Sequence, residues 1–397
     1  MGDRSAGALD GVVVVDMTTA RSGPTCTRQL ADMGAEVIRV VDPRRGDIGG
    51  SDGANLVRSK RSVAIDLRLP DGRRAFDVLM ARADVFVENM RPAVKTRLGI
   101  GPDVLCGRHP RLVYASLSGF GQTGPYADRA GVDQIAQGLA GVMSVTGPPG
   151  QGPWRVGIAI SDSAAGTFLT QGVLAALFAR ERTGRGQWVH TSLLESMLNL
   201  MDFQACRWLT DGEVPAQSGN DHPTFFPMGT YRCADGWVNI AGLKAIEGFL
   251  GALDLLGLLD DERFATNEAR RAHRTEFTEA CELRMASMTV TDCVERMVAA
   301  DIPAGPVLAL DAVFEDPQVR HLTFVETRPD PDGRPVALLR HPVTFDATPT
   351  AIGDGPHAPG ADTVSVLREC GVDDATIDEW SISGGVGMSA EPSRWLE

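Results

Sequence analysis

Short apolar runs alternate with amphipathic stretches over the first half of the chain. Residues 11–16 read Gly-Val-Val-Val-Val-Asp, an unbroken apolar run that is typical of a fully buried strand. Residues 24–33 have the apolar spacing of a helix, and residues 36–41 form a second apolar run. A strand, a helix and a strand in this order indicate a parallel sheet. The same pattern continues, with strands predicted at 62–67, 84–89 and 112–118 and a helix at 71–82.

The pattern changes near residue 210. A polar segment that contains proline, residues 211–228, suits a linker, and residues 229–241 predict a hairpin with an Asp-Gly turn. We therefore predict an α/β fold: a Rossmann-like large domain with a smaller α+β domain. The predicted division is 1–210 for the large domain, 211–228 for the linker, 229–330 for the small domain and 331–397 for a C-terminal segment that returns to the large domain.

Composition narrows the class of protein. A chain of 397 residues is too long for one compact core, which supports two domains. The net charge of −14 argues against a nucleic-acid partner, because such partners favour a basic surface. Seven scattered cysteines without ligand-like spacing suggest reduced thiols and no metal site. The chain begins without a signal-peptide pattern and holds no run long enough to span a membrane, so we expect a cytoplasmic protein.

The first strand-to-helix turn decides between two kinds of nucleotide ligand. A dinucleotide-binding turn needs three glycines, whereas residues 20–25 read Ala-Arg-Ser-Gly-Pro-Thr. A nicotinamide cofactor is therefore disfavoured. Cations recur after the predicted strands instead, where the loops of a parallel sheet gather, and would suit a ligand that carries phosphates. They are Arg21, Arg39, Arg44, Arg45, Lys60, Arg61, Arg91 and Arg97.

Asp162 lies where a predicted strand, 156–161, gives way to a long apolar helix pattern, 167–177. An acid at such a junction is an ordinary helix cap or an activated carboxylate nucleophile. Its local sequence alone favours the cap.

Several stretches, taken in order, resemble the class III CoA-transferase family, also known as the CaiB/BaiF family. The family comprises acyl-CoA:carboxylate CoA-transferases and α-methylacyl-CoA racemases. The resemblance implies interlocked homodimers, coenzyme A and its acyl thioesters as substrates, a carboxylic acid acceptor, and no resident cofactor, metal or nicotinamide. The stretches that carry it are 22–40, 59–67, 87–92, 110–126, 181–187 and 302–307.

The resemblance also assigns residues. Asp162 matches the catalytic aspartate, which would form a covalent aspartyl-CoA thioester. One departure concerns Asp42, which stands where the family often has an arginine, so that Arg44 or Arg45 would have to replace that contact. The residues implied to contact CoA are Arg21, Ser22, Lys60, Asn89, Met90, Arg91, Arg97, Ala130, Gly131, Val132 and Asp133.

The residue type at position 132, here Val132, distinguishes the transferase branch of the family from the racemase branch. Racemisation next to a thioester usually needs acid/base groups on both faces of the carbon, and the racemase branch carries a histidine at this position. Valine cannot move a proton, so CoA transfer is favoured; racemisation and CoA binding without turnover remain alternatives. The acceptor stays open, because Phe225, Phe226 and Met228 suit either an acyl-binding wall or a core. His222, beside a proline, suits an acceptor contact or a structural role.

Overall fold

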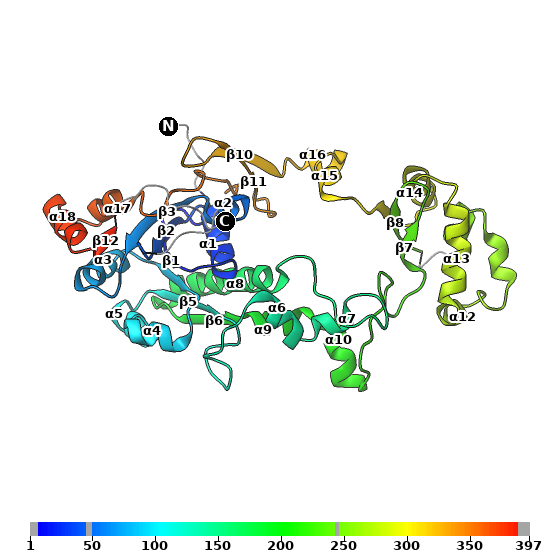
Figure 1. Ribbon diagram of the computed structural model, residues 1–397, viewed down its shortest axis with the longest axis horizontal. Helices are drawn as coiled ribbons and strands as arrows, with labels where there is room; N and C mark the ends of the chain where they lie inside the picture. Colours follow the sequence, from blue (N-terminus) through cyan, green and yellow to red (C-terminus); the bar gives the residue numbers. More distant parts are fainter. Residues whose placement is uncertain (1–6, 45–49, 243–245, 388–397) are drawn as a thin grey trace. The chain divides into compact units, whose positions relative to one another are not determined.

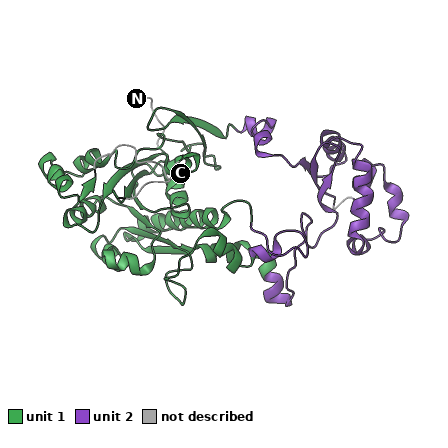
Figure 2. Cartoon of the chain, viewed as in Figure 1, with its two compact units in different colours: residues 1–141, 156–205, 323–397 green, residues 142–155, 206–322 purple. Residues whose placement is uncertain are grey.

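The computed structural model describes residues 7–44, 50–242 and 246–387 (Figure 1). The chain divides into two compact units, coloured separately in Figure 2. Unit 1 consists of 1–141, 156–205 and 323–397, and unit 2 of 142–155 and 206–322. The division differs from the expected ranges in one notable way: the segment 142–155 interrupts unit 1 and belongs with unit 2.

Unit 1 is built on a large, mostly parallel sheet in the order β12-β3-β2-β1-β4-β5-β6. Six of these strands are parallel and follow the doubly wound order 3-2-1-4-5-6, while β12 pairs antiparallel with β3 at the edge. The predicted mixed α/β fold with a parallel sheet is confirmed. The strands are β1 (Val13–Met17), β2 (Glu36–Val41), β3 (Lys60–Ile65), β4 (Val85–Glu88), β5 (Val113–Ser118), β6 (Trp188–Ser192) and β12 (Val386–Gly387).

Helices cover both faces of this sheet. Side chains alternate along a strand, so Val15 packs into the apolar core on one face while Asp16 points to the other face, under α1. The helix α1 (Ser22–Asp32) packs along the long helix α8 (Ile160–Thr183). The other helices of unit 1 are α2 (Gly50–Val57), α3 (Pro70–Met80), α4 (Pro92–Leu98), α5 (Pro102–Arg108), α6 (Asp133–Leu139), α9 (Leu193–Leu200), α10 (Asp202–Cys206), α17 (Thr363–Glu369) and α18 (Asp374–Ile382); α10 reaches the boundary with unit 2.

The strand predicted at 156–161 is wrong. Residues 156–159 are irregular, and α8 begins at Ile160. Ile158 is 63% exposed, and no strand pairing is present at residues 156–161. A short apolar run does not by itself distinguish a strand from the start of a buried helix, and here the end of the run begins α8.

Unit 2 has its own antiparallel sheet and its own core. The predicted hairpin is present as β7 (Met228–Arg232) and β8 (Trp237–Ala241), and β9 (Ala304–Pro306) adds a third strand. A cluster of buried apolar side chains, including Phe226, Phe249 and Phe277, fills the space under the helices. The helices of unit 2 are α7 (Val142–Val145), α11 (Ile246–Ala252), α12 (Asn267–Ala272), α13 (Arg274–Met285), α14 (Val290–Ala299), α15 (Leu310–Val313) and α16 (Pro317–His321), with a π-helix at Arg207–Asp211 and a 3-10 helix at Leu256–Asp260.

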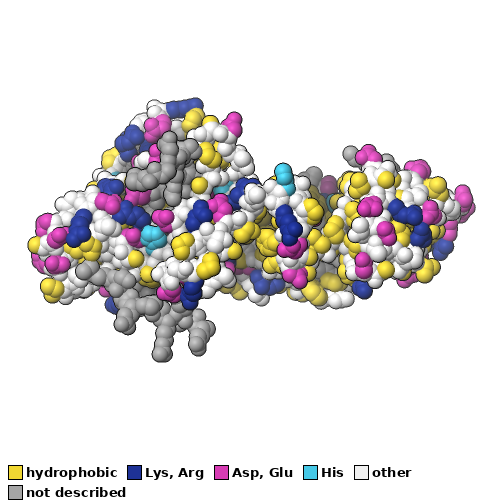
Figure 3. Space-filling view, turned by 90° about the horizontal axis from the view of Figure 1, so that it is seen from above, with side chains coloured by type: hydrophobic (Ala, Val, Ile, Leu, Met, Phe, Trp, Pro, Cys, Tyr) yellow, Lys and Arg dark blue, Asp and Glu magenta, His cyan; other side chains and the backbone are white. Residues whose placement is uncertain are grey.

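A second hairpin, β10 (Val325–Pro329) with β11 (Pro335–Leu339), returns the chain to unit 1. On the face drawn in Figure 3, acidic and basic side chains are interspersed. Within the described ranges, none of the helices has the length and apolar character needed to cross a membrane.

Candidate active site

Asp162 is the third residue of α8, so it lies inside the first turn of the helix. The N-cap position is Ala159, and the cap role considered for Asp162 is therefore wrong. Asp133 serves that end of the helix instead: its Oδ1 accepts the Ser161 backbone N–H at 2.9 Å and the Ser161 hydroxyl at 2.8 Å. Asp133 thus accepts one of the free backbone N–H groups at the start of α8, and Asp162 has no capping bond to this helix.

The surroundings of Asp162 make its carboxylate more basic than usual. Burial raises the pKa of Asp162, and the negative charge of Asp133 raises it further. A hydrogen bond from the side chain of Ser22 and the positive charge of Arg21 act in the opposite direction without cancelling the rise. The result is a half-buried, poorly solvated carboxylate at the positive end of a long helix, a setting in which charge formed during acyl transfer is stabilised.

Gly166 explains how Ser22 and Arg21 come to lie beside Asp162. A Cβ at position 166 would stand 2.5 Å from the backbone oxygen of Ser22 and 2.8 Å from the Cβ of Thr25. Only glycine allows α1 and α8 to approach this closely. Hydrogen bonds fix the same contact further along, from Gln29 Nε2 to Thr167 Oγ1 at 3.0 Å.

The turn between β1 and α1 lies where the strand order reverses, between β1 and β4. Asn89, directly after β4, holds this turn with two hydrogen bonds to the backbone of Thr19: its Oδ1 accepts the N–H at 3.0 Å and its Nδ2 donates to the oxygen at 2.7 Å. Ala20 has a φ of 60°, a conformation that residues with a Cβ adopt rarely and that often marks functional turns. In doubly wound folds, ligands bind outside the carboxyl ends of the strands at this reversal.

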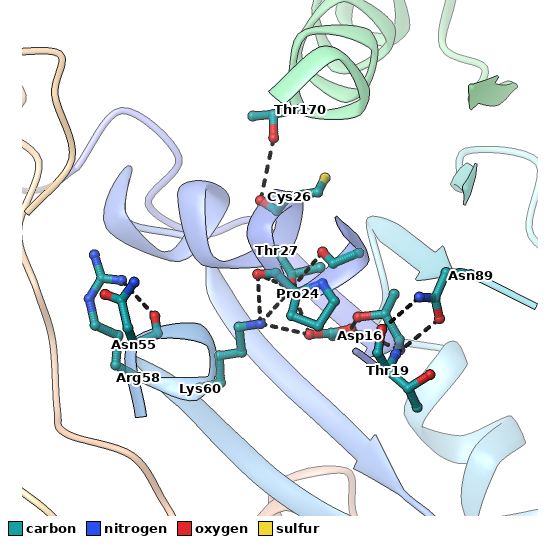
Figure 4. Close-up of polar contacts among 12 residues, drawn as sticks. Asp16, Thr19, Pro24, Cys26, Thr27, Asn55, Arg58, Lys60, Asn89 and Thr170 are labelled. Atoms are coloured by element: carbon teal, nitrogen blue, oxygen red, sulfur yellow. Dashed lines mark hydrogen bonds and ion pairs between the residues drawn. The ribbon is translucent and has the colours of Figure 1, made fainter. Parts of the chain in front are cut away.

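Lys60, expected at the ligand, is buried under α1 (Figure 4). Its Nζ donates to Asp16 Oδ2 at 3.0 Å, Thr27 Oγ1 at 2.6 Å and the Pro24 oxygen at 3.1 Å, and no part of either charged side chain is exposed. Burial alone would raise the pKa of Asp16, but Lys60 and nearby hydroxyls outweigh it and lower the pKa. In this geometry Lys60 ties α1 to β1 and β3.

The remaining expected CoA contacts fall into two groups. Met90 is half-buried and follows Asn89 directly, while Arg91 and Arg97 are exposed at the start and in the last turn of α4. The loop 130–133 enters α6, and Gly131 packs against the backbone of Gly119 so closely that a Cβ there would lie 2.6 Å from its Cα. In this loop Ala130 is exposed, Val132 is 60% exposed, and Asp133 is buried.

Beside Asp42, which stands where the family often has an arginine, lies an arginine that the sequence analysis did not single out. Arg68 Nη2 lies 2.9 Å from Asp42 Oδ2, and its Nε lies 2.7 Å from Asp66 Oδ1. Arg44 reaches the same two acids at 3.4 and 3.5 Å. Arg45 lies outside the described residues. Two arginines therefore gather at the carboxyl ends of β2 and β3.

Each unit contains a cavity. In unit 2, a cavity of about 610 Å³ is lined by His222, Met228, Asn239 and Pro303, among others. The Nδ1 of His222 accepts the backbone N–H groups of Thr224 at 3.2 Å and of Phe225 at 3.1 Å, which fixes the ring. Of the proposed acyl wall, Met228 lines this cavity. Phe226, with 1% exposure, belongs to the core, and Phe225 is 54% exposed.

A second cavity, of about 330 Å³, lies in unit 1 and was not predicted. A signal was present in α1: polar side chains at positions 21, 25, 28, 29 and 32 repeat with a helical period and form one face. The opposite wall comes from Arg340 and His341, which are too distant in sequence to be connected with α1 by spacing. The residues that line this cavity are Arg21, Thr25, Arg28, Gln29, Asp32, Asn55, Leu56, Ser163, Thr167, Arg340, His341 and Pro342.

Comparisons with known proteins define the class. The model of CoA-transferase family III matches residues 9–363, and the chain belongs to this family. It is similar to the succinate–glutarate CoA-transferase of Agrobacterium fabrum (34% identity, 86% of this chain and 90% of that protein). It is also similar to the succinyl-CoA–D-citramalate CoA-transferase of Chloroflexus aurantiacus (33% identity, 87% and 89%). A crystal structure of a CaiB/BaiF family protein from Brucella suis superposes with a TM-score of 0.83 at 32% identity, covering 92% of this chain and 100% of that one.

The protein is thus an enzyme that transfers CoA between an acyl-CoA and a carboxylate. CoA thioesters are its substrates, as the family assignment requires.

Proposed function

We propose that this enzyme transfers CoA through a covalent thioester on Asp162. The observation that carries the proposal is the environment of this carboxylate. It is half-buried, its pKa is raised, and the side chain of Ser22 hydrogen-bonds to it, while Asp133 accepts the neighbouring Ser161 N–H at the start of the helix. A carboxylate in that state is a better nucleophile than a solvated one, because less hydration is lost when it attacks.

The chemistry runs in two symmetrical halves. The Asp162 carboxylate attacks the carbonyl of the donor thioester, which gives a mixed anhydride and releases CoA thiolate. The thiolate attacks the aspartyl carbonyl, which leaves an aspartyl-CoA thioester and frees the donor acid. The acceptor carboxylate then attacks the aspartyl thioester and again expels CoA thiolate. Attack of this thiolate on the acceptor carbonyl of the new anhydride gives the acyl-CoA product and restores Asp162.

The neighbours of Asp162 take supporting roles. Backbone N–H groups of the first turn of α8 are placed to stabilise the oxyanions that form at the aspartyl carbon. We assign the CoA moiety to the turn around Arg21 and Ser22 and to the loop with Asn89, Met90 and Arg91, because these meet at the strand-order reversal. Arg97 and the loop 130–133 complete the proposed contact set, whereas Lys60 supports α1 from below.

Racemisation is the weaker alternative. At the position where that branch places its histidine, the side chain is Val132. The adjacent Asp133 is engaged through both carboxylate oxygens, with Ser161 on Oδ1 and Gln137 on Oδ2 at 2.7 Å. Neither residue offers a base for the second face of the substrate. By analogy with the substrates that the relatives are named for, we propose short dicarboxylic acids as substrates. From the resemblance to the family, we also propose a homodimeric enzyme without a resident cofactor.

Steady-state kinetics test this proposal. Initial rates with succinyl-CoA as the donor and a panel of carboxylic acids should give parallel double-reciprocal lines, the pattern of a substituted enzyme. Intersecting lines, which require the donor and the acceptor on the enzyme together, would contradict a scheme in which the donor acid leaves before the acceptor binds. Exchange of deuterium at the carbon next to the thioester, in the absence of an acceptor, would favour the racemase instead.

The hydrogen bond from Ser22 gives a prediction on pH dependence. The nucleophile must be ionised, so activity should fall as the pH drops through the raised pKa of Asp162. Ser22→Ala removes a bond that lowers this pKa, and bonds to charged groups contribute about 1.5–3 kcal/mol. The acid limb of the kcat/KM profile should therefore move to higher pH. Ser365→Ala, an exposed serine on α17, is the control and should leave the limb in place; a limb that does not move in Ser22→Ala would show that another group controls it.

A further inference from the structure

The cavity of about 330 Å³ in unit 1 has an excess of positive charge. Three arginines line it, Arg21, Arg28 and Arg340, against one carboxylate, that of Asp32. Asp32 is already paired with another arginine, since Arg58 Nη2 lies 2.8 Å from its Oδ2 and both side chains are almost fully buried. In a protein with a net charge of −14, such a concentration of cations around one small cavity calls for an anionic ligand.

Arg28 is a cation in this wall on which the charge of Asp32 acts without a direct contact. Among the described residues, none forms a hydrogen bond or an ion pair with Arg28, and its Nε is buried. Arg21, by contrast, pairs with Asp52 of α2. A buried guanidinium N–H that meets no acceptor is costly, and a carboxylate is the group whose geometry matches it best.

His341, which also lines the cavity, lies close to the same positive charges. Burial lowers the pKa of His341, and the charges of Arg28, Arg58 and Arg340 lower it further. A neutral imidazole and the hydroxyls of Thr25 and Thr167 add polar groups without adding negative charge.

The lining of the cavity includes the chain neighbour of the proposed nucleophile. Ser163, the residue after Asp162 on α8, lines it, and Arg21 both lines it and acts on the charge of Asp162. Its volume is at the lower end of the range for small-molecule sites, which suits a short organic acid and is small for the nucleotide end of CoA.

We propose that this cavity binds the remote carboxylate of a dicarboxylic acyl group, with Arg28 as its main partner, while the other end of the same group reacts at Asp162. The inference rests on the proposed function and deepens it, because it assigns to specific residues the selection of dicarboxylic over monocarboxylic substrates. Arg28 acts here as a specificity-determining residue and takes no part in bond making.

The first half-reaction offers a sharp test, because two donors can be compared that share the whole CoA moiety. Succinyl-CoA and butyryl-CoA differ in the carboxylate at the far end of a four-carbon acyl chain. In single-turnover experiments, Arg28→Leu should slow formation of the Asp162 adduct from succinyl-CoA by roughly 10- to 100-fold and leave butyryl-CoA within about twofold. Arg28→Lys, which keeps the charge, should recover part of the rate, and Arg108→Leu, on the exposed face of α5, should change neither donor.

The outcomes distinguish a failure of the proposed role of the cavity from a failure of the proposed aspartyl mechanism. If Arg28→Leu slows both donors equally, the cavity serves the phosphates of CoA or the fold, and the inference is overturned while the aspartyl mechanism stands. A wild-type enzyme that reacts with butyryl-CoA as fast as with succinyl-CoA would overturn it too. If the wild-type protein forms no adduct with either donor while it turns over, the proposed function itself fails, and this inference fails with it.

Discussion

Replacing Asp162 with alanine should abolish CoA transfer while leaving the fold intact. Loss of a covalent nucleophile typically costs at least about 10³-fold in kcat/KM, because the reaction loses its intermediate and not merely a contact. The side chain lies in the first turn of α8, whose N-cap is Ala159 and whose Ser161 N–H is accepted by Asp133, so the substitution removes no capping bond. The melting temperature should stay close to that of the wild type. Coupled assays of acyl-CoA formation and thermal unfolding provide the two readouts.

A control from the same helix sharpens this result. Glu181 lies in the last turn of α8, its side chain is 67% exposed, and it makes long ion pairs with the exposed Arg111 at 3.4 Å and the buried Arg180 at 3.5 Å. Glu181→Ala should retain full activity, since such pairs contribute little. Substantial activity in Asp162→Ala would overturn the mechanism, and equal losses in both variants would point to a general effect on α8.

Lys60→Met should destabilise unit 1 by about 3–5 kcal/mol, because it leaves the carboxylate of Asp16 buried without its counter-charge. The pKa of Asp16 is lowered in the wild type, so the pair contributes stability above the pKa of an unfolded aspartate and loses it as the pH falls. Without Lys60, burial should raise the pKa of Asp16, and the deficit should be largest near neutral pH and shrink below about pH 4. Urea unfolding at several pH values measures it.

The neighbouring residue is a matched control. Arg61, on the same strand, makes partly exposed ion pairs with Glu36 and Glu369, and Arg61→Met should cost about 1 kcal/mol. The double variant Asp16→Asn with Lys60→Met should recover part of the loss, because no uncompensated charge is then buried. A stable Lys60→Met protein with a sharply raised KM for the CoA donor would show instead that Lys60 contacts the ligand.

The elements that could be predicted from sequence are those whose patterns are local. The apolar runs of β1 and β2 and the helical spacing of α1 fixed a parallel sheet, and the Asp-Gly turn marked the hairpin of unit 2. The strand predicted at 156–161 failed because a short apolar run fits a strand or the start of a buried helix, and periodicity alone does not distinguish them.

Some residues of the site could likewise be placed from the sequence, and others could not. Residues close to a strand end, such as Asn89 and Arg21, can be placed from topology, because parallel strands bring their carboxyl ends to one edge. The partner of Lys60 could not be foreseen, since it depends on which face of β1 and β3 lies under α1. The cavity around Arg28 depends on Arg340, which lies more than 300 positions away along the chain.

If Asp162 carries CoA during turnover, a donor given without an acceptor should leave CoA on this residue. The enzyme is incubated with succinyl-CoA in the absence of an acceptor, quenched, digested and mapped by mass spectrometry, with hydroxylamine treatment to convert an aspartyl thioester into a hydroxamate. We expect a CoA adduct, and after treatment a hydroxamate, on the peptide that contains Asp162 and on that residue alone. An adduct on another residue, or an unmodified Asp162 in enzyme that is active under the same conditions, would contradict it.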